Sequence, residues 1–226
     1  MGPPTTPCDE ACAIHLQKMI PPVPASYLYK QTMIRTELPN ECWVENGDIP
    51  VELQFSQSQY DDLWNSHPVD RHRIYIYNKW HTVPRWQQAY GKCYEFSGNV
   101  SVALPISPQI QACVEWANSN ETNNGRTGGF NGALLNWYED GEHHIGWHSD
   151  NEGPLVKNQP IYTISLGATR SFKIRNKSHT NSETYELSNN NYLIMGGKFQ
   201  SYYKHQLPVR KKCKTSRISI TLRIFK

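Results

Sequence analysis

The last segment of the chain, Arg217 to Arg223, alternates strictly between polar and apolar residues. Side chains alternate across a strand, so this pattern predicts a strand with two unlike faces. The apolar face carries Ile218, Ile220 and Leu222, and the polar face carries Arg217, Ser219, Thr221 and Arg223. Two arginines on one face are typical either of a solvated edge strand or of a strand facing a cavity that holds an anion. The pattern alone leaves both interpretations open.

Similar patterns predict the other elements. Eight short strands are expected from residue 130 onward, at 132–138, 145–148, 160–166, 170–175, 184–187, 192–195, 201–206 and 217–225. Two helices are expected before them, at 54–66 and about 108–117, and the polar composition of 118–129 predicts a loop. Short strands with close turns favour a jelly roll over a sandwich of long strands. We therefore expect a fold that is mainly β with flanking helices.

Composition sets the limits of the molecule. With 226 residues the chain is long enough for one domain with an extension, and the Pro-, Thr-, Asn- and Glu-rich residues 1–50 predict that extension, partly flexible. Neither a run of about 18 apolar residues nor a signal peptide is visible. The six cysteines lack zinc or redox spacing. We therefore expect no membrane contact and an intracellular location, nuclear or cytoplasmic, as a monomer.

The charge is unevenly distributed. Residues 71–226 hold twenty basic and ten acidic residues, and five of the basic ones lie in the acid-free stretch 71–92. Aromatic residues are interleaved there, among them Tyr75, Tyr77 and Trp80. Cations among rings predict phosphate attraction combined with base stacking, the pattern of a nucleic-acid surface. The alternative is a set of solvated cations around a barrel.

Candidate metal ligands follow in a fixed order. His148-Ser-Asp150 is followed several predicted strands later by His205. Two histidines and one carboxylate form the facial triad of non-haem Fe(II) oxygenases, which leaves positions open for other ligands. The same three residues would also suit a zinc hydrolase. Arg217 downstream favours the oxygenase, because a guanidinium binds the carboxylate of a 2-oxoglutarate co-substrate in a bidentate fork.

The predicted strand 132–138 adds a second polar pair. Asn136 and Tyr138 are two residues apart and therefore share a face. An amide and a phenol at these positions would hydrogen-bond the keto acid. The alternative for Tyr138 is a buried ring with a satisfied hydroxyl.

Several motifs together resemble those of the AlkB family, Fe(II)/2-oxoglutarate dioxygenases that demethylate alkylated nucleic-acid bases. They are Asn136-Trp-Tyr138, His148-Ser-Asp150-Asn-Glu152, Ile164-Ser-Leu-Gly-Ala-Thr-Arg170, His205-Gln-Leu-Pro208 and Arg217 to Arg223. Upstream, Lys79-Trp-His-Thr-Val-Pro-Arg85, Ala89-Tyr-Gly91 and Tyr94-Glu-Phe-Ser-Gly98 resemble the base-handling region of the eukaryotic DNA-repair homologues. The resemblance covers roughly residues 50–226. The departures are Ser219 for a usual Asn, Leu222 for a usual Phe, and Trp137 between Asn136 and Tyr138.

The resemblance implies a double-stranded β-helix (jelly roll) with an N-terminal nucleotide-recognition lid. The domain would span 51–226, with the lid and support helices in 51–129 and the jelly-roll core in 130–226. It implies Fe(II) on His148, Asp150 and His205, with 2-oxoglutarate and O2 as co-substrates. The residues expected around 2-oxoglutarate are Asn136, Tyr138, Arg217, Ser219, Thr221 and Arg223.

The implied substrate is alkylated DNA, with RNA as an open alternative, and the implied reaction is oxidative demethylation of 1-methyladenine or 3-methylcytosine with formaldehyde release. Phe96 would stack on a flipped base, and Glu152 would accept a hydrogen bond from its exocyclic amine. Tyr77 would be a wedge in a duplex, or else an ordinary strand residue. Arg85 would meet phosphates, and Arg170 is expected among the substrate contacts.

Other readings remain at this point. A 2-oxoglutarate-dependent hydroxylase of a protein or a lipid would share the triad, and so would a nucleic-acid-binding module with a weak oxygenase core. Within the family, His148-Ser-Asp150-Asn-Glu152 resembles the single-strand-preferring homologue, whereas Leu207-Pro-Val-Arg-Lys-Lys212 resembles the duplex-preferring one. The sequence therefore does not decide whether the substrate is DNA or RNA, whether it is a duplex or a single strand, or which methylated base it carries.

Overall fold

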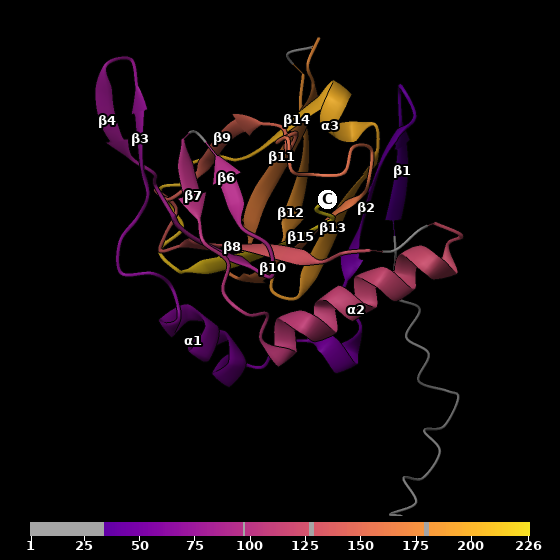
Figure 1. Cartoon of the computed structure of the whole chain (residues 1–226), viewed down its shortest axis with the longest axis horizontal. Helices are drawn as coiled ribbons and strands as arrows, with labels where there is room; N and C mark the ends of the chain where they lie inside the picture. The colour runs from indigo at the N-terminus through magenta and orange to yellow at the C-terminus, as the bar shows by residue number, and fades with distance from the viewer. Residues whose placement is uncertain (1–33, 97, 127–128, 179–180) are drawn as a thin grey trace, which may run out of the picture. The chain divides into compact units, whose positions relative to one another are not determined.

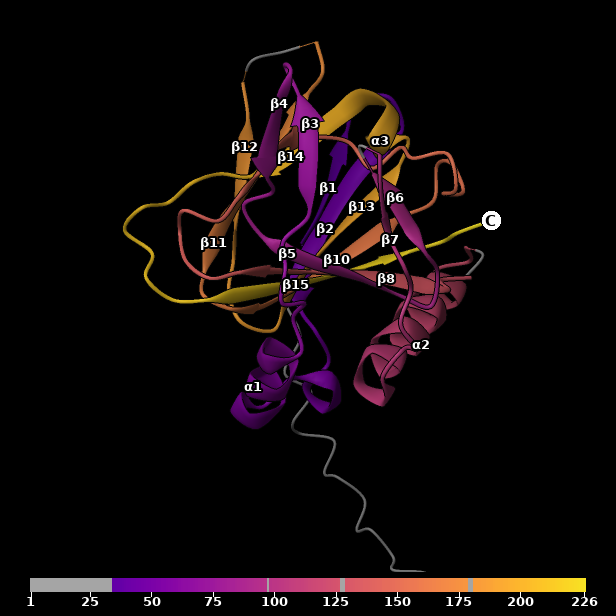
Figure 2. The ribbon, with the colours of Figure 1, turned by 60° about the vertical axis from the view of Figure 1, so that its left-hand side comes forward.

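The computed structural model describes residues 34–96, 98–126, 129–178 and 181–226. Two antiparallel sheets form the centre of the fold (Figures 1 and 2). The larger has seven strands in the order β1 (Ile34–Leu38), β2 (Cys42–Asp48), β13 (Asn191–Gly197), β10 (Ile161–Gly167), β15 (Arg217–Arg223), β8 (Gly132–Tyr138) and β5 (Trp86–Tyr90). The smaller has four, in the order β12 (Glu183–Leu187), β11 (Arg170–Asn176), β14 (Tyr203–Leu207) and β9 (Ile145–His148).

The two sheets pack face to face. Their shared core contains Val44 and Leu193 from the larger sheet and Phe172 and Ile174 from the smaller one. Two further hairpins stand beside them, β3 (Arg73–Ile76) with β4 (Lys79–Thr82) and β6 (Tyr94–Phe96) with β7 (Asn99–Ser101). This arrangement confirms the expected fold class, a jelly roll that is mainly β.

Helices cover the outer face of the larger sheet. They are η2 (Val51–Leu53), α1 (Gln57–Asn65) and α2 (Pro108–Asn123), while the short α3 (Phe199–Tyr202) precedes β14. Leu63 of α1 and Ile110 of α2 share a core with Leu135, Trp137 and Ile220 of the sheet. Ser56 caps α1 reciprocally with Gln59, which fixes where the helix begins. Among the described residues no helix is long and apolar enough to cross a membrane.

Two predicted elements are corrected. The loop expected at 118–129 is helical as far as Asn123, because tertiary contacts stabilise its polar residues: the side chain of Asn118 accepts from the backbone N–H of Phe130, and Glu121 is buried and accepts from the hydroxyl of Tyr162. The strand expected at 201–206 begins only at Tyr203, because α3 occupies the residues before it.

The boundary predicted at residue 50 is also corrected for the described residues. β2 pairs with β13 along all seven of its residues, and β1 pairs with β2. Trp43 and Val44 are buried in two different clusters of the core. Residues 34–48 therefore belong to the main sheet rather than to an extension. Residues 1–33, for which flexibility was predicted, lie outside the described part of the chain.

Candidate active site

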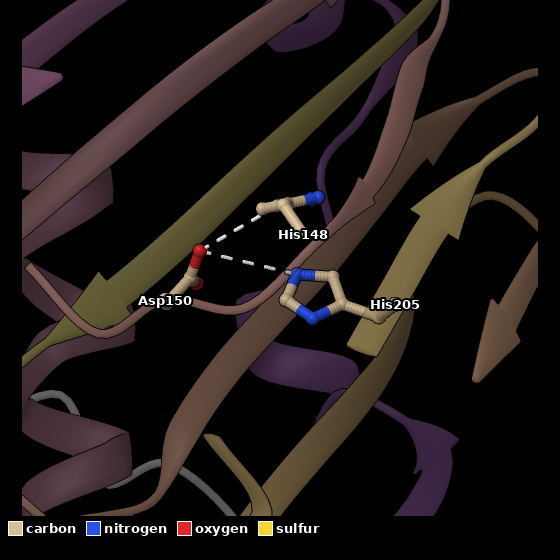
Figure 3. Close-up of side chains that lie close together, drawn as sticks. All are labelled: His148, Asp150 and His205. Atoms are coloured by element: carbon tan, nitrogen blue, oxygen red, sulfur yellow. Dashed lines mark ion pairs between the residues drawn. The ribbon is translucent and has the colours of Figure 1, made fainter. Parts of the chain in front are cut away.

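Two neighbouring strands of the smaller sheet bring the predicted metal ligands together. β14 pairs with β9 so that His205 stands directly opposite His148, and Asp150 follows β9 by two residues. The Nε2 atoms of His148 and His205 lie 3.5 Å and 3.9 Å from Oδ1 of Asp150. Figure 3 shows the three side chains pointing toward one another. Their candidate ligand atoms all lie within 4.8 Å of one another, the spacing of a single metal site.

The hydrogen bonds around the triad leave the ligand atoms free for a cation. Nδ1 of His148 lies 2.8 Å from the carbonyl oxygen of Gly146, so a proton on Nδ1 donates there and Nε2 stays available. Oδ2 of Asp150 accepts from Nη2 of Arg223 at 2.8 Å, whereas Oδ1 is buried and has no partner. An orphaned carboxylate oxygen facing two imidazole nitrogens fits a bound divalent metal.

The protonation states agree with this interpretation. Burial lowers the pKa of His205 to about 3, and nearby His148 acts in the same direction. Burial also lowers the pKa of His148. Burial alone would raise the pKa of Asp150, but Arg223 and the two histidines hold it below its usual range. At neutral pH the triad therefore presents two neutral imidazoles and one carboxylate, the forms that bind a metal.

The polar face of β15 forms the second half of the site. β15 lies between β10 and β8, which excludes the solvated edge strand and leaves the cavity interpretation. Arg217 and Arg223 are 1% and 4% exposed. Nε of Arg217 donates to Oγ of Ser165 at 3.0 Å, but Nη2 of Arg217 and both Nε and Nη1 of Arg223 have no partner. Burial lowers the pKa of Arg217 to about 10. Buried, unpaired guanidinium N–H groups fit an anion with two carboxylates.

A cavity of about 630 Å³ joins these two halves and extends toward the β3–β4 and β6–β7 hairpins. The larger sheet supplies its anion-binding side, and β9 and β14 supply its metal side. Twelve of the predicted site residues line it: Arg85, Phe96, Asn136, Tyr138, His148, Asp150, Glu152, His205, Arg217, Ser219, Thr221 and Arg223. The structure therefore gathers residues from opposite ends of the domain around one volume.

Arg85 is placed differently from the prediction. Instead of reaching outward to phosphates, it lines the cavity, and its Nε donates to Oδ1 of Asn136 at 2.9 Å. β5 pairs with β8 so that Gln87 stands opposite Asn136, and Arg85 precedes Gln87 by two residues. Burial lowers the pKa of Arg85. Arg85 therefore belongs to the wall of the cavity.

Arg170 is a second correction. It is 1% exposed and does not line the cavity. Its guanidinium donates to the backbone carbonyls of Asp140, His143 and Pro208 at 2.9, 3.0 and 2.8 Å. Arg170 therefore holds together two segments that flank the cavity, the loop before β9 and the end of β14, and has no access to a substrate.

Tyr94 is a site residue that the sequence analysis missed. Its hydroxyl donates to Oε1 of Glu152 in a short hydrogen bond, while Oε2 of Glu152 is buried without a partner. Its ring stacks on Phe96 at 5.8 Å and lies under the guanidinium of Arg223 at 4.8 Å. The available signal was Tyr94-Glu-Phe96, because residues two apart on a strand share a face.

Tyr77 lies outside the cavity, in the turn between β3 and β4. Tyr77 and Asn78 both have positive φ, 49° and 58°, as a two-residue type I′ turn requires. The side chain of Tyr77 is 94% exposed. Tyr77 is therefore not an ordinary strand residue, because its exposed ring lies on a turn.

The comparisons with known proteins agree with this geometry. A model of the 2OG-Fe(II) oxygenase superfamily matches residues 52–223. Human DNA oxidative demethylase ALKBH2 is 35% identical over 162 residues, which are 67% of this chain and 60% of that protein. Human alpha-ketoglutarate-dependent dioxygenase alkB homolog 3 is 33% identical over 115 residues, 47% of this chain and 40% of that protein. This chain thus spans less than two thirds of the length of either relative.

A solved structure entitled "The structure of OsALKBH1" shares the fold alone. It is 14% identical with a TM-score of 0.50 and covers 84% of this chain and 100% of its own. Fold and site thus define a jelly-roll oxygenase with a histidine–carboxylate metal site. The chain belongs to the 2OG-Fe(II) oxygenase superfamily and, within it, to the AlkB family. This family implies Fe(II), 2-oxoglutarate and O2, and excludes the zinc hydrolase.

Proposed function

We propose that this protein oxidatively demethylates N-alkylated bases of the 1-methyladenine or 3-methylcytosine type in DNA. The observation that carries the proposal is the composition of one cavity: a buried metal triad and unpaired arginines on one side, and an aromatic ring with an unpaired carboxylate oxygen on the other. The similarity to proteins named DNA oxidative demethylase supports the same substrate class.

Each side chain has a defined task in this proposal. His148, Asp150 and His205 hold Fe(II), and Arg217 with Arg223 binds the carboxylates of 2-oxoglutarate. When bound, the iron together with 2-oxoglutarate and O2 supplies the oxidation of the N-methyl group, which leaves as formaldehyde while 2-oxoglutarate becomes succinate and CO2.

The other side of the cavity selects the base. The ring of Phe96 packs on the flipped base, and Oε2 of Glu152 accepts a hydrogen bond from the exocyclic amine of that base. The hydroxyl of Tyr94 occupies Oε1 and so orients the carboxylate. Burial raises the pKa of Tyr94, so this phenol stays protonated and remains a donor at neutral pH. Adenine and cytosine carry an exocyclic amine, whereas thymine does not. The carboxylate therefore favours methylated adenine and cytosine as the bases that the cavity accepts.

The proposal extends to assembly and location. We propose a monomer as the active unit. A DNA substrate would require an intracellular location, nuclear or cytoplasmic.

Formaldehyde release tests the function. One sequence carrying a single 1-methyladenine or 3-methylcytosine is offered as single-stranded DNA, as duplex DNA and as RNA, with the unmethylated strand and the omission of 2-oxoglutarate as controls. We expect 2-oxoglutarate-dependent formaldehyde from at least one of the DNA forms. Activity on RNA alone would show that the substrate is RNA and not DNA. Absence of activity on every strand, with 2-oxoglutarate consumed on a protein or lipid, would establish the alternative hydroxylase.

The position of Tyr77 leads to a prediction on duplex substrates. A ring on a hairpin tip can occupy the gap that a flipped base leaves, and it offsets part of the lost stacking. Tyr77→Ala should lower kcat/KM on duplex DNA by about tenfold or more, because base–ring stacking contributes ~1–3 kcal/mol. On a single strand the loss should be small. Phe96→Ala is the matched comparison and should impair both forms. Equal losses on duplex and single strand for Tyr77→Ala would contradict the wedge.

A further inference from the structure

The β3–β4 hairpin has two faces with different partners. In its register Tyr75 stands opposite Trp80 and Arg73 opposite Thr82, while Ile74 stands opposite His81. Directly opposed residues of an antiparallel pair share a face, and neighbours along a strand lie on opposite faces. Ile74 lines the active-site cavity. Tyr75 and Trp80 therefore lie on the face turned away from the cavity, and we call them the outer ring pair.

The outer ring pair is open to solvent. Tyr75 is 56% exposed and Trp80 is 60% exposed. Their ring centroids are 5.2 Å apart and their planes are tilted by 56°, so neither ring covers the face of the other. Exposed apolar groups that lie together mark interaction sites more often than single exposed side chains do. Neither the metal chemistry nor the cavity uses them.

The surroundings of the pair are cationic. The guanidinium of Arg73 lies 5.3 Å from the centre of the Trp80 ring. Residues 71–92 contain five basic residues and no acidic one. The guanidinium lies over one face of the Trp80 ring. Exposed rings beside a cation are an arrangement that binds single-stranded nucleic acid, where rings stack on bases and cations meet phosphates.

We propose that the outer ring pair binds unpaired bases of the nucleic-acid strand outside the cavity, as a second site on the other face of the hairpin. This inference rests on the proposed function for its choice of nucleic acid as the ligand class. The hairpin then contacts one strand on both faces: Ile74 borders the cavity that receives the methylated base, and the outer ring pair holds unpaired bases elsewhere on that strand. Arg73, beside Trp80, meets a phosphate of the held segment.

Binding measured without turnover tests the second site. The probe is a fluorescein-labelled, unmethylated single-stranded DNA of twelve nucleotides, and fluorescence anisotropy is recorded with the full chain in the absence of Fe(II). The double variant Tyr75→Ala/Trp80→Ala should raise Kd by at least tenfold, because base–ring stacking is lost. Tyr75→Phe/Trp80→Phe should bind within about twofold of the parent, because stacking needs a ring and not a hydroxyl or an indole N–H.

Two controls separate the ring pair from general effects. Tyr202→Ala removes another exposed ring, 41% exposed on α3, and should leave Kd unchanged. Arg73→Ala should flatten the salt dependence of Kd by about one counterion, whereas the double alanine variant should keep the parent slope. A parent-like Kd in the double alanine variant would overturn the proposal. So would a parent that is dimeric and a variant that is monomeric on size exclusion, because the pair would then be a contact between copies.

Kinetics distinguish this inference from the proposed function. On a methylated strand of twelve nucleotides the double alanine variant should raise KM far more than on a methylated trinucleotide, which is too short to reach both sites. If the parent demethylates neither substrate and the double variant still loses DNA binding, the proposed function fails and the second site stands. If the parent demethylates both with the same KM, and the variant matches it, the second site fails and the proposed function stands.

Discussion

Alanine in place of His148, Asp150 or His205 is expected to abolish 2-oxoglutarate-dependent formaldehyde release. Each variant removes one of three ligand atoms that converge within 4.8 Å. Replacing a residue that merely orients a ligand already weakens metal binding by about 10–100-fold, so loss of a ligand should exceed that range. Anaerobic titration of the protein with Fe(II) or Mn(II) measures the affinity directly, independently of turnover.

The stability of the metal-free variants gives this prediction a second readout. Asp150→Ala leaves the buried Arg223 without its carboxylate partner, and breaking a buried pair in this way costs about 3–5 kcal/mol of unfolding free energy. His148→Ala should cost much less, because that side chain is 30% exposed and pairs weakly. Denaturant unfolding with a chelator present compares the two. Any of the three alanine variants that retained turnover would contradict the triad, and equal stability losses would contradict the buried Asp150–Arg223 pair.

Arg217→Ala is expected to raise the 2-oxoglutarate concentration for half-maximal activity by about 100-fold. The buried Nη2 of Arg217 has no hydrogen-bond partner in the protein, and we expect the co-substrate to accept a hydrogen bond from it. A hydrogen bond to a charged group contributes about 1.5–3 kcal/mol, and a 100-fold change corresponds to about 2.7 kcal/mol. Metal affinity should stay near that of the parent, since Nε of Arg217 donates to Ser165 and not to a residue of the triad.

Arg223→Ala should affect metal binding as well as 2-oxoglutarate binding, because Arg223 bonds to Asp150 and also has unpaired N–H groups. Its Nη2 donates to Asp150 at 2.8 Å, while Nε and Nη1 are unpaired. Its loss should therefore weaken both metal binding and 2-oxoglutarate binding. Ser165→Ala is the mild control for Arg217, since it removes one hydrogen bond and leaves the guanidinium in place. A steep 2-oxoglutarate effect in Arg223→Ala with a mild one in Arg217→Ala would show that the two arginines are assigned to the wrong roles.

The position of Arg85 refines how the two halves of the cavity meet. Its Nε holds Asn136, so the amide expected to bind the keto acid is already engaged through its oxygen. The Nδ2 group of Asn136 is the part left to donate to the co-substrate. Three arginines thus line a cavity whose carboxylates are Asp150 and Glu152. This balance favours an anionic co-substrate.

Local patterns in the sequence determined much of this molecule. The alternation along 217–223 set both the strand and the face on which Arg217 and Arg223 lie, because side-chain direction in a strand depends only on position parity. The same parity put Asn136 and Tyr138 together. The order of His148, Asp150 and His205 indicated the metal site, because the chemistry depends on residue type. These signals needed no knowledge of distant contacts.

Only the tertiary structure decided the remainder. The sequence predicted substrate contacts for both Arg170 and Arg85. In the structure Arg170 donates to backbone carbonyls, whereas Arg85 lines the cavity, because strand pairing determines what surrounds each guanidinium. The polar end of α2 is helical because Asn118 and Glu121 find hydrogen-bond partners in Phe130 and Tyr162, 12 and 41 residues later in the chain. β1 and β2 join the main sheet through β13, about 150 residues later in the chain. In each case the stabilising contact comes from a residue outside the local segment, so the composition of that segment cannot predict it.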